Sequence, residues 1–176
     1  MTVLLVPGLG NSGPDHWMSH WERALPAERA DLGDWDDPHP ESWIPRLDAE
    51  IAAAGSGVVL VAHSLGCACI AHWAGSHRRP VRAALLVAPP DVDSDAHVPP
   101  VVRRFAPMPM ERLPFRAVVV ASANDPYADI ARAEVFAKAW GAEFRNIGAK
   151  GHINAASNLG SWPEGRALLN RLLTEP

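Results

Sequence analysis

The sequence is poor in cysteine and lysine and has no long apolar run. Its two cysteines, Cys67 and Cys69, lie two positions apart on one predicted helix and point to different faces. That spacing suits neither a disulfide nor a zinc site, so we expect two small buried core residues and a reduced, cytoplasmic setting. The N-terminal apolar run ends at Pro7 and has no basic residues before it, so we expect neither a signal peptide nor a membrane span.

Basic charge is also scarce. The formal net charge is −4, and the only basic pairs that stand out are Arg78-Arg79 and Arg103-Arg104. We therefore expect no nucleic-acid partner. The apolar fraction of 48% is typical of a globular chain, and 176 residues suffice for one domain, residues 1–176, with a sizeable core.

Apolar segments with strand and helix periodicity alternate along the chain. Strands are predicted at 2–6, within 26–32, at 58–63, 81–87, 115–122 and 142–147. Helices are predicted from Gly13-Pro14 to about 25, at 42–54, after Ser64, at 129–140, and after Ser161, whose spacing to Glu164 resembles a capping box. This order predicts a mostly parallel six-stranded α/β sheet with helices on both faces, and places any site at the carboxyl ends of the strands.

The stretch around Ser64 is the strongest indication of function. Five apolar residues lead into His63-Ser64, and a helical stripe follows, with Ala62 and Gly66 two positions either side of the serine. This pattern is typical of a nucleophile elbow, although Ala62 replaces the first glycine of G-x-S-x-G. The alternative is a serine that caps an ordinary helix of a doubly wound sheet.

A catalytic serine needs a base and an orienting acid, which follow it in this chain order. His152 is the histidine that comes after the strand at 115–122, in the loop beyond the last strand, and Asp125 follows the preceding strand. Asp129 is the competing acid, but it reads as a residue of the first helical turn. The alternatives are a turn residue for Asp125 and an unpartnered loop histidine for His152.

Two backbone amides are expected to form an oxyanion hole. One is Leu65, directly after the serine, and the other is Leu9 in the loop after the first strand, with Gly10 in reserve. A nucleotide-phosphate loop is the alternative for these glycines. It lacks both G-x-G-x-x-G and a Walker lysine, and Pro14 would remove an amide from the helix start.

The remaining histidines indicate no metal. His16 and His20 are spaced i, i+4 but lack the glutamate of H-E-x-x-H, so we interpret them as packing or surface residues. His63 and His72 are expected in the core, held by backbone hydrogen bonds. We expect no cofactor and no metal.

Motifs along nearly the whole chain resemble one family, the small serine hydrolases of the α/β-hydrolase fold that include the retinoblastoma-binding protein 9. The resemblance rests on Val6-Pro7-Gly8, His16-Trp17, Trp21-Glu22, Ala62 to Gly66, Phe105 to Pro109, Leu113 to Phe115, Ala121-Ser122, Asn124 to Tyr127, Trp140 to Ala142, Gly151 to Asn154, Gly160 and Trp162-Pro163. It implies a compact hydrolase without the first two strands and the cap domain of larger relatives, with a Ser64–Asp125–His152 triad and modest esterase activity. The Leu-x-Cys-x-Glu motif behind that protein's name is incomplete here, because Cys69 stands at the position of the glutamate.

The expected function is therefore hydrolysis of a small ester, thioester or activated amide by a carboxylesterase-like serine hydrolase. The substrate is expected to contact Gly10, His63, Tyr127 and Ile153 in a shallow pocket beneath the 89–114 loop. The alternatives are a non-catalytic binding module, an acyltransferase with the same triad and, more distantly, a nucleotide-binding protein.

Overall fold

Six strands form one parallel sheet at the centre of the molecule. The computed structural model describes residues 2–175 and places the strands in the order β2-β1-β3-β4-β5-β6, with every neighbouring pair parallel. The predicted mostly parallel sheet is thus confirmed, and it is parallel throughout. The strands are β1 (Val3–Val6), β2 (Ala27–Arg29), β3 (Val58–His63), β4 (Val81–Val87), β5 (Arg116–Ala121) and β6 (Glu143–Asn146).

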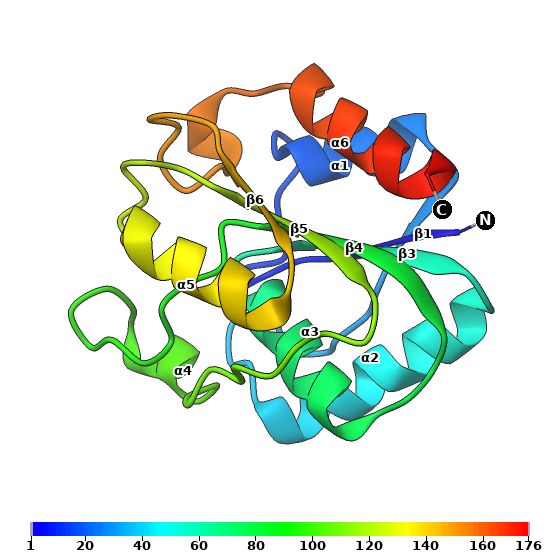
Figure 1. The fold of residues 1–176 in the computed structure, drawn as a ribbon, viewed down its shortest axis with the longest axis horizontal. Helices are drawn as coiled ribbons and strands as arrows, with labels where there is room; N and C mark the ends of the chain where they lie inside the picture. Colours follow the sequence, from blue (N-terminus) through cyan, green and yellow to red (C-terminus); the bar gives the residue numbers. More distant parts are fainter. Residues whose placement is uncertain (1, 176) are drawn as a thin grey trace.

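Helices cover both faces of this sheet (Figure 1). One face carries α1 (Trp17–Ala24) and α6 (Pro163–Thr174), and the other carries α2 (Pro40–Ala54), α3 (Leu65–Ser76) and α5 (Ile130–Trp140). A short α4 (Pro100–Arg103) and a 3-10 turn, η1 (Ala155–Ser157), lie in loops. None of the helices in residues 2–175 combines the length and apolar character that a bilayer span requires.

The central strands are apolar throughout because both of their faces are covered. Every residue of β3 is buried, as are the last five residues of β4 and of β5. A parallel sheet between two helical layers favours such continuous apolar runs over alternating ones. The short edge strand β6 has no buried residue, which fits its single neighbour.

Two helix starts differ from the prediction. Helix α1 begins at Trp17 rather than near Pro14, because the His16 Nδ1 caps it by accepting the Met18 N–H at 3.1 Å. Helix α6 begins after Trp162, with φ +45° and no side-chain cap bond, so the predicted Ser161 capping box is wrong. Trp162 is buried and stacks on Trp21 with ring centroids 5.9 Å apart. Burying an indole stabilises more than a cap bond worth about 1 kcal/mol.

The sheet order has one reversal, between β1 and β3. Strands run outward from β1 to β2 on one side, and from β3 through β6 on the other. Such a reversal opens a crevice beyond the carboxyl ends of the two strands at the switch point. The loop after β1 and the turn after β3 therefore meet at one place, which is where the sequence predicts the site.

The 89–114 loop closes over this end of the sheet. The Asp91 N–H donates to the Tyr127 carbonyl at 2.9 Å, and Arg132 from α5 contacts Asp91 and Asp93 at 3.2 and 2.8 Å. This loop contains the short helix α4, which starts at Pro100. The loop is thus tied to the rest of the domain rather than extended into solvent.

Candidate active site

Ser64 occupies a strained turn between β3 and α3. Its backbone has φ +54° and ψ −125°, a conformation that costs a residue with a side chain about 1–3 kcal/mol. The turn packs closely against β1 at Gly66, where a Cβ would lie 2.3 Å from the Val6 carbonyl oxygen. Ala62 is fully buried in β3, so a methyl group is accommodated at the first position of the pattern while the second requires glycine.

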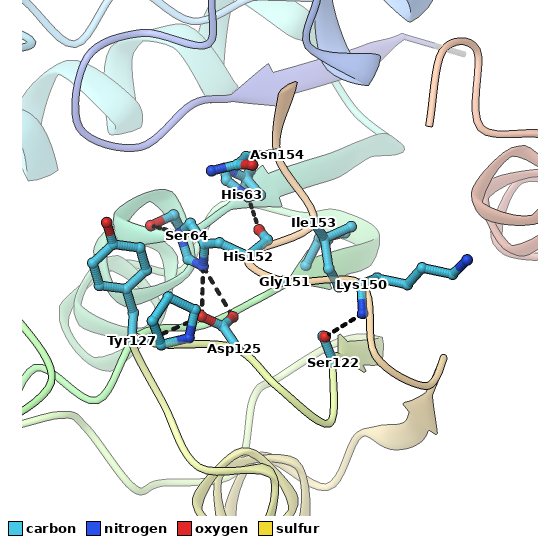
Figure 2. A network of polar contacts seen from close by, with 12 residues as sticks. His63, Ser64, Ser122, Asp125, Tyr127, Lys150, Gly151, His152, Ile153 and Asn154 are labelled. Atoms are coloured by element: carbon cyan, nitrogen blue, oxygen red, sulfur yellow. Dashed lines mark hydrogen bonds and ion pairs between the residues drawn. The ribbon is translucent and has the colours of Figure 1, made fainter. Parts of the chain in front are cut away.

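Ser64, His152 and Asp125 form one hydrogen-bonded chain (Figure 2). The Ser64 Oγ lies 2.8 Å from His152 Nε2, and His152 Nδ1 lies 2.9 and 3.0 Å from the two carboxylate oxygens of Asp125. The side chains of His152 and Asp125 are 9% and 4% exposed. A neutral imidazole with its proton on Nδ1 donates to the carboxylate and accepts from the hydroxyl, which is the arrangement that activates a serine.

The structure distinguishes between the two candidate acids. Asp125 follows β5, and its Oδ1 also accepts the Tyr127 N–H at 2.9 Å. Asp129 instead stands at the N-cap of α5, where it contacts His97 at 3.5 Å. Asp125 therefore contacts the imidazole and Asp129 does not.

The loop after β1 lies directly against the elbow. A Cβ on Gly8 would come within 2.9 Å of the Leu65 amide nitrogen and of the Ser64 Cβ, so this position admits only glycine. Leu65 is the first residue of α3, where a backbone N–H has no partner within the helix. The Gly10 N–H donates to the Trp35 carbonyl at 2.9 Å, so this reserve candidate for the oxyanion hole is already engaged.

A cavity of about 210 Å³ opens at Ser64. An apolar wall comes from the 89–114 loop, and a polar wall comes from the β1–α1 loop and the loop after β6. Its lining residues are Leu9, Ser12, His16, His63, Ser64, Pro90, Val98, Pro99, Val102, Tyr127, His152 and Asn154.

Two of the four predicted substrate contacts line this cavity, namely His63 and Tyr127. Ile153 does not, because its side chain is fully buried in the core beneath α1 and α6. Gly10 also lies outside the lining, in an exposed turn whose amide is engaged by Trp35. Both residues have a left-handed backbone, with φ +75° at Gly10 and φ +49° at Ile153, and neither lines the cavity.

The rings of His16, His63 and His152 lie next to one another, edge-to-face for the first pair and tilted for the second, a cluster that sequence reasoning missed. Ring centroids are 4.6 Å apart for His16 and His63, and 4.8 Å apart for His63 and His152. Burial, helped by the nearby charges of Arg29 and His152, lowers the pKa of His16 to about 4. Burial also holds the pKa of His63 well below its usual value. The sequence does contain a signal of this cluster, because His16-Trp17 is one of the motifs on which the family resemblance rests. The i, i+4 spacing instead led us to consider His16 together with His20.

The other singled-out residues have structural contacts. The His63 and His72 rings hydrogen-bond the carbonyls of His152 and Phe105 at 2.9 and 2.7 Å, as predicted, although His72 is only half-buried. Cys67 and Cys69 are buried and unpaired, and burial raises the pKa of both thiols. Within residues 2–175, no three His, Cys, Asp or Glu side chains are grouped as metal ligands would be.

Comparison with known proteins adds the family. A model of the serine hydrolase family matches residues 3–171. A protein from Pectobacterium atrosepticum described as a YdeN-like hydrolase is 30% identical, with a TM-score of 0.86 over 97% of this chain and 89% of that chain. The ydeN product of B. subtilis is 19% identical, with a TM-score of 0.80 over 99% of both chains. Curated proteins gave no match.

More distant structures share the fold alone. Est1E from Butyrivibrio proteoclasticus, solved with ferulic acid bound, is 12% identical, with a TM-score of 0.74 over 98% of this chain and 90% of that chain. The parallel sheet, its helical layers and the position of the elbow agree with this architecture. Residues 2–175 contain no cap domain. The chain belongs to the serine hydrolase family and has the α/β-hydrolase fold.

Proposed function

We propose that this protein is a carboxylesterase-like hydrolase that cleaves a small ester, thioester or activated amide through an acyl-enzyme on Ser64. One observation carries the proposal. A serine in a strained elbow is 2.8 Å from an imidazole that is itself held by a nearly buried carboxylate. A serine that merely caps a helix needs neither partner.

In the proposed reaction, His152 Nε2 takes the hydroxyl proton as Ser64 Oγ attacks the substrate carbonyl carbon. The carbonyl π electrons move to its oxygen, and the Leu9 and Leu65 amides donate hydrogen bonds to that oxyanion. Collapse of the tetrahedral intermediate breaks the bond to the leaving group, which receives the proton from His152. Water then repeats the sequence, with His152 as base, and releases the acid and free Ser64. Asp125 stabilises the imidazolium throughout.

The cavity supports a short acyl group as substrate. About 210 Å³ holds a small organic group, and its apolar wall of Pro90, Val98, Pro99 and Val102 suits a hydrocarbon chain. Tyr127 lies beside His152 with ring centroids 4.4 Å apart, at a position where its hydroxyl can bind a polar group of the substrate.

Within the family we group the chain with the small members that include the retinoblastoma-binding protein 9.

Labelling with a fluorophosphonate, followed by mass spectrometry of the adduct, tests the proposal. We expect one adduct on Ser64 in the wild type and none in S64A, with labelling in H152A slowed to near the rate of ordinary serines. S76A, at the far end of α3, serves as the control and should label normally. No adduct on folded wild-type protein would contradict the proposal and favour a non-catalytic binding module.

An acyltransferase is the second candidate, since it would label identically. Products formed from a short acyl ester in the presence of added alcohols or amines separate the two. Free acid as the main product supports hydrolysis, whereas transfer product as the main species would replace the hydrolase with a transferase.

A further inference from the structure

The loop that carries His152 is held by its neighbours at four consecutive residues. On the side of the acid loop, the Lys150 N–H donates to Ser122 Oγ at 2.8 Å, and the Gly151 N–H donates to Asn124 Oδ1 at 2.7 Å. The Ser122 hydroxyl also donates to Asn124 Oδ1 at 2.9 Å. The two residues before His152 are therefore hydrogen-bonded to the segment after β5, which also carries Asp125.

The other side of the loop is held by two aromatic N–H groups. The His63 Nε2–H donates to the His152 carbonyl at 2.9 Å (Figure 2), and the Trp17 Nε1–H donates to the Ile153 carbonyl at 2.8 Å. His63 ends β3, one residue before Ser64, and Trp17 begins α1. Both donor side chains are buried. Side chains from β3 and α1 thus hydrogen-bond the backbone at and directly after the proposed base.

The backbone between these two bonds is strained. Ile153 has φ +49° and a fully buried side chain. The left-handed region is a genuine outlier for a β-branched residue, so surrounding contacts must impose this conformation. The two carbonyls that flank it are the ones that His63 and Trp17 hold. Because this residue directly follows His152, relaxation of its backbone would move the imidazole.

We propose that His63 and Trp17 are positioning residues that set the distance from His152 Nε2 to the Ser64 hydroxyl by clamping the two carbonyls. The inference rests on the proposed function, because it assigns a role relative to the proposed base. A misplacement of about 1 Å costs about 10²-fold in rate. Loss of the Trp17 clamp bond should therefore lower kcat by about 10- to 100-fold and leave KM within about twofold, because Trp17 does not line the cavity.

W17F tests the clamp, because phenylalanine keeps an aromatic ring and removes the N–H. W21F is its matched control. Trp21 is equally buried on the same helix and donates its Nε1–H at 2.8 Å to the Ser161 carbonyl, outside the base loop. We expect both variants to lose similar thermal stability, and only W17F to lose kcat and the rate of fluorophosphonate labelling. The low-field proton resonance of the His152–Asp125 hydrogen bond should weaken in W17F and persist in W21F.

His63 is tested by a second pair, which serves even where W17F does not fold. H63Q keeps a donor near the position of Nε2, whereas H63M has none, so H63Q should retain at least about tenfold more kcat than H63M. Equal kcat in both members of each pair, with the wild type labelled at Ser64, would overturn the clamp and leave the proposed function standing. An unlabelled wild type would instead reject the proposed function itself.

Discussion

We predict that the buried histidine at the start of α1 makes the fold less stable in mild acid than at neutral pH. His16 caps α1 through Nδ1 and is 3% exposed, and its Nε2 is buried without a hydrogen-bond partner. Its pKa falls from 6.5 to about 4, chiefly through burial. The substitution H16N removes the titrating ring and keeps a good N-cap side chain.

The sign and size of the effect follow from proton linkage. Between pH 6.5 and 4 the unfolded chain binds a proton at His16 and the folded chain does not, so stability falls as the pH falls. With these two pKa values, this single site lowers the free energy of unfolding by about 2 kcal/mol between pH 7 and 5, and by about 3 kcal/mol at pH 4. His97, whose pKa is raised chiefly by the Pro126 carbonyl, acts in the opposite sense, because its contribution is lost as the pH rises.

Urea unfolding of wild type and H16N at pH 7, 6 and 5 measures this effect. With a slope of about 2 kcal/mol/M, the wild-type midpoint should fall by about 1 M more than that of H16N between pH 7 and 5. Titrating groups that do not contact His16, His97 included, are common to both proteins and cancel in the difference. Any loss of packing in H16N shifts its curve equally at each pH. Parallel pH dependences would refute the assignment of His16 as a buried neutral side chain.

Three further tests address the site and its support. G66A, whose Cβ would lie 2.3 Å from a β1 carbonyl, should destabilise by several kcal/mol, whereas G75A in the same helix meets no atom within 4 Å and should stabilise by about 0.5–1 kcal/mol in thermal melts. G8A should displace the loop after β1, which we propose to supply an oxyanion donor, and lower kcat by at least about 10²-fold with a normal helical circular dichroism spectrum. Unchanged kcat would argue against that loop as a donor. D125N should lower kcat by about 10⁴-fold while D129N has little effect, and equal losses would reject Asp125 as the orienting acid.

The fold could be predicted where burial leaves a pattern in the sequence. Strands β3, β4 and β5 are covered on both faces, so their positions are continuous apolar runs that periodicity detects. Element ends were harder to predict. The start of α1 depends on His16 as N-cap and that of α6 depends on Trp162, and neither residue type is a usual cap. Both helix starts lie where aromatic rings from α1 and α6 pack together on the same face of the sheet. These contacts join residues far apart in the sequence, so no local sequence pattern indicates them.

The chain of Ser64, His152 and Asp125 could be anticipated because parallel strands end at one edge, so residues that follow three strands meet. The cavity lining could not be anticipated to the same degree. Ile153 is next to His152 in sequence, but its left-handed backbone turns the side chain into the core. His16 is far from the other site residues in sequence and joins them only because α1 begins beside the β3 elbow.

The neutrality of the histidine cluster matters for the proposed chemistry. The base must carry a positive charge in the transition state, and the His63 ring lies 4.8 Å from it. A second charge at about that distance would oppose it by about 3 kcal/mol at an effective dielectric of 20, which is about 200-fold in rate. Burial lowers the pKa of His63 and of His16, so both rings provide shape and hydrogen bonds without charge. Arg29 lowers the pKa of His16 further while it holds the carbonyls of Asn11 and Ser12 at 2.9 and 3.1 Å. The same guanidinium therefore fixes the loop that follows Leu9 and helps keep the cluster beside the base uncharged.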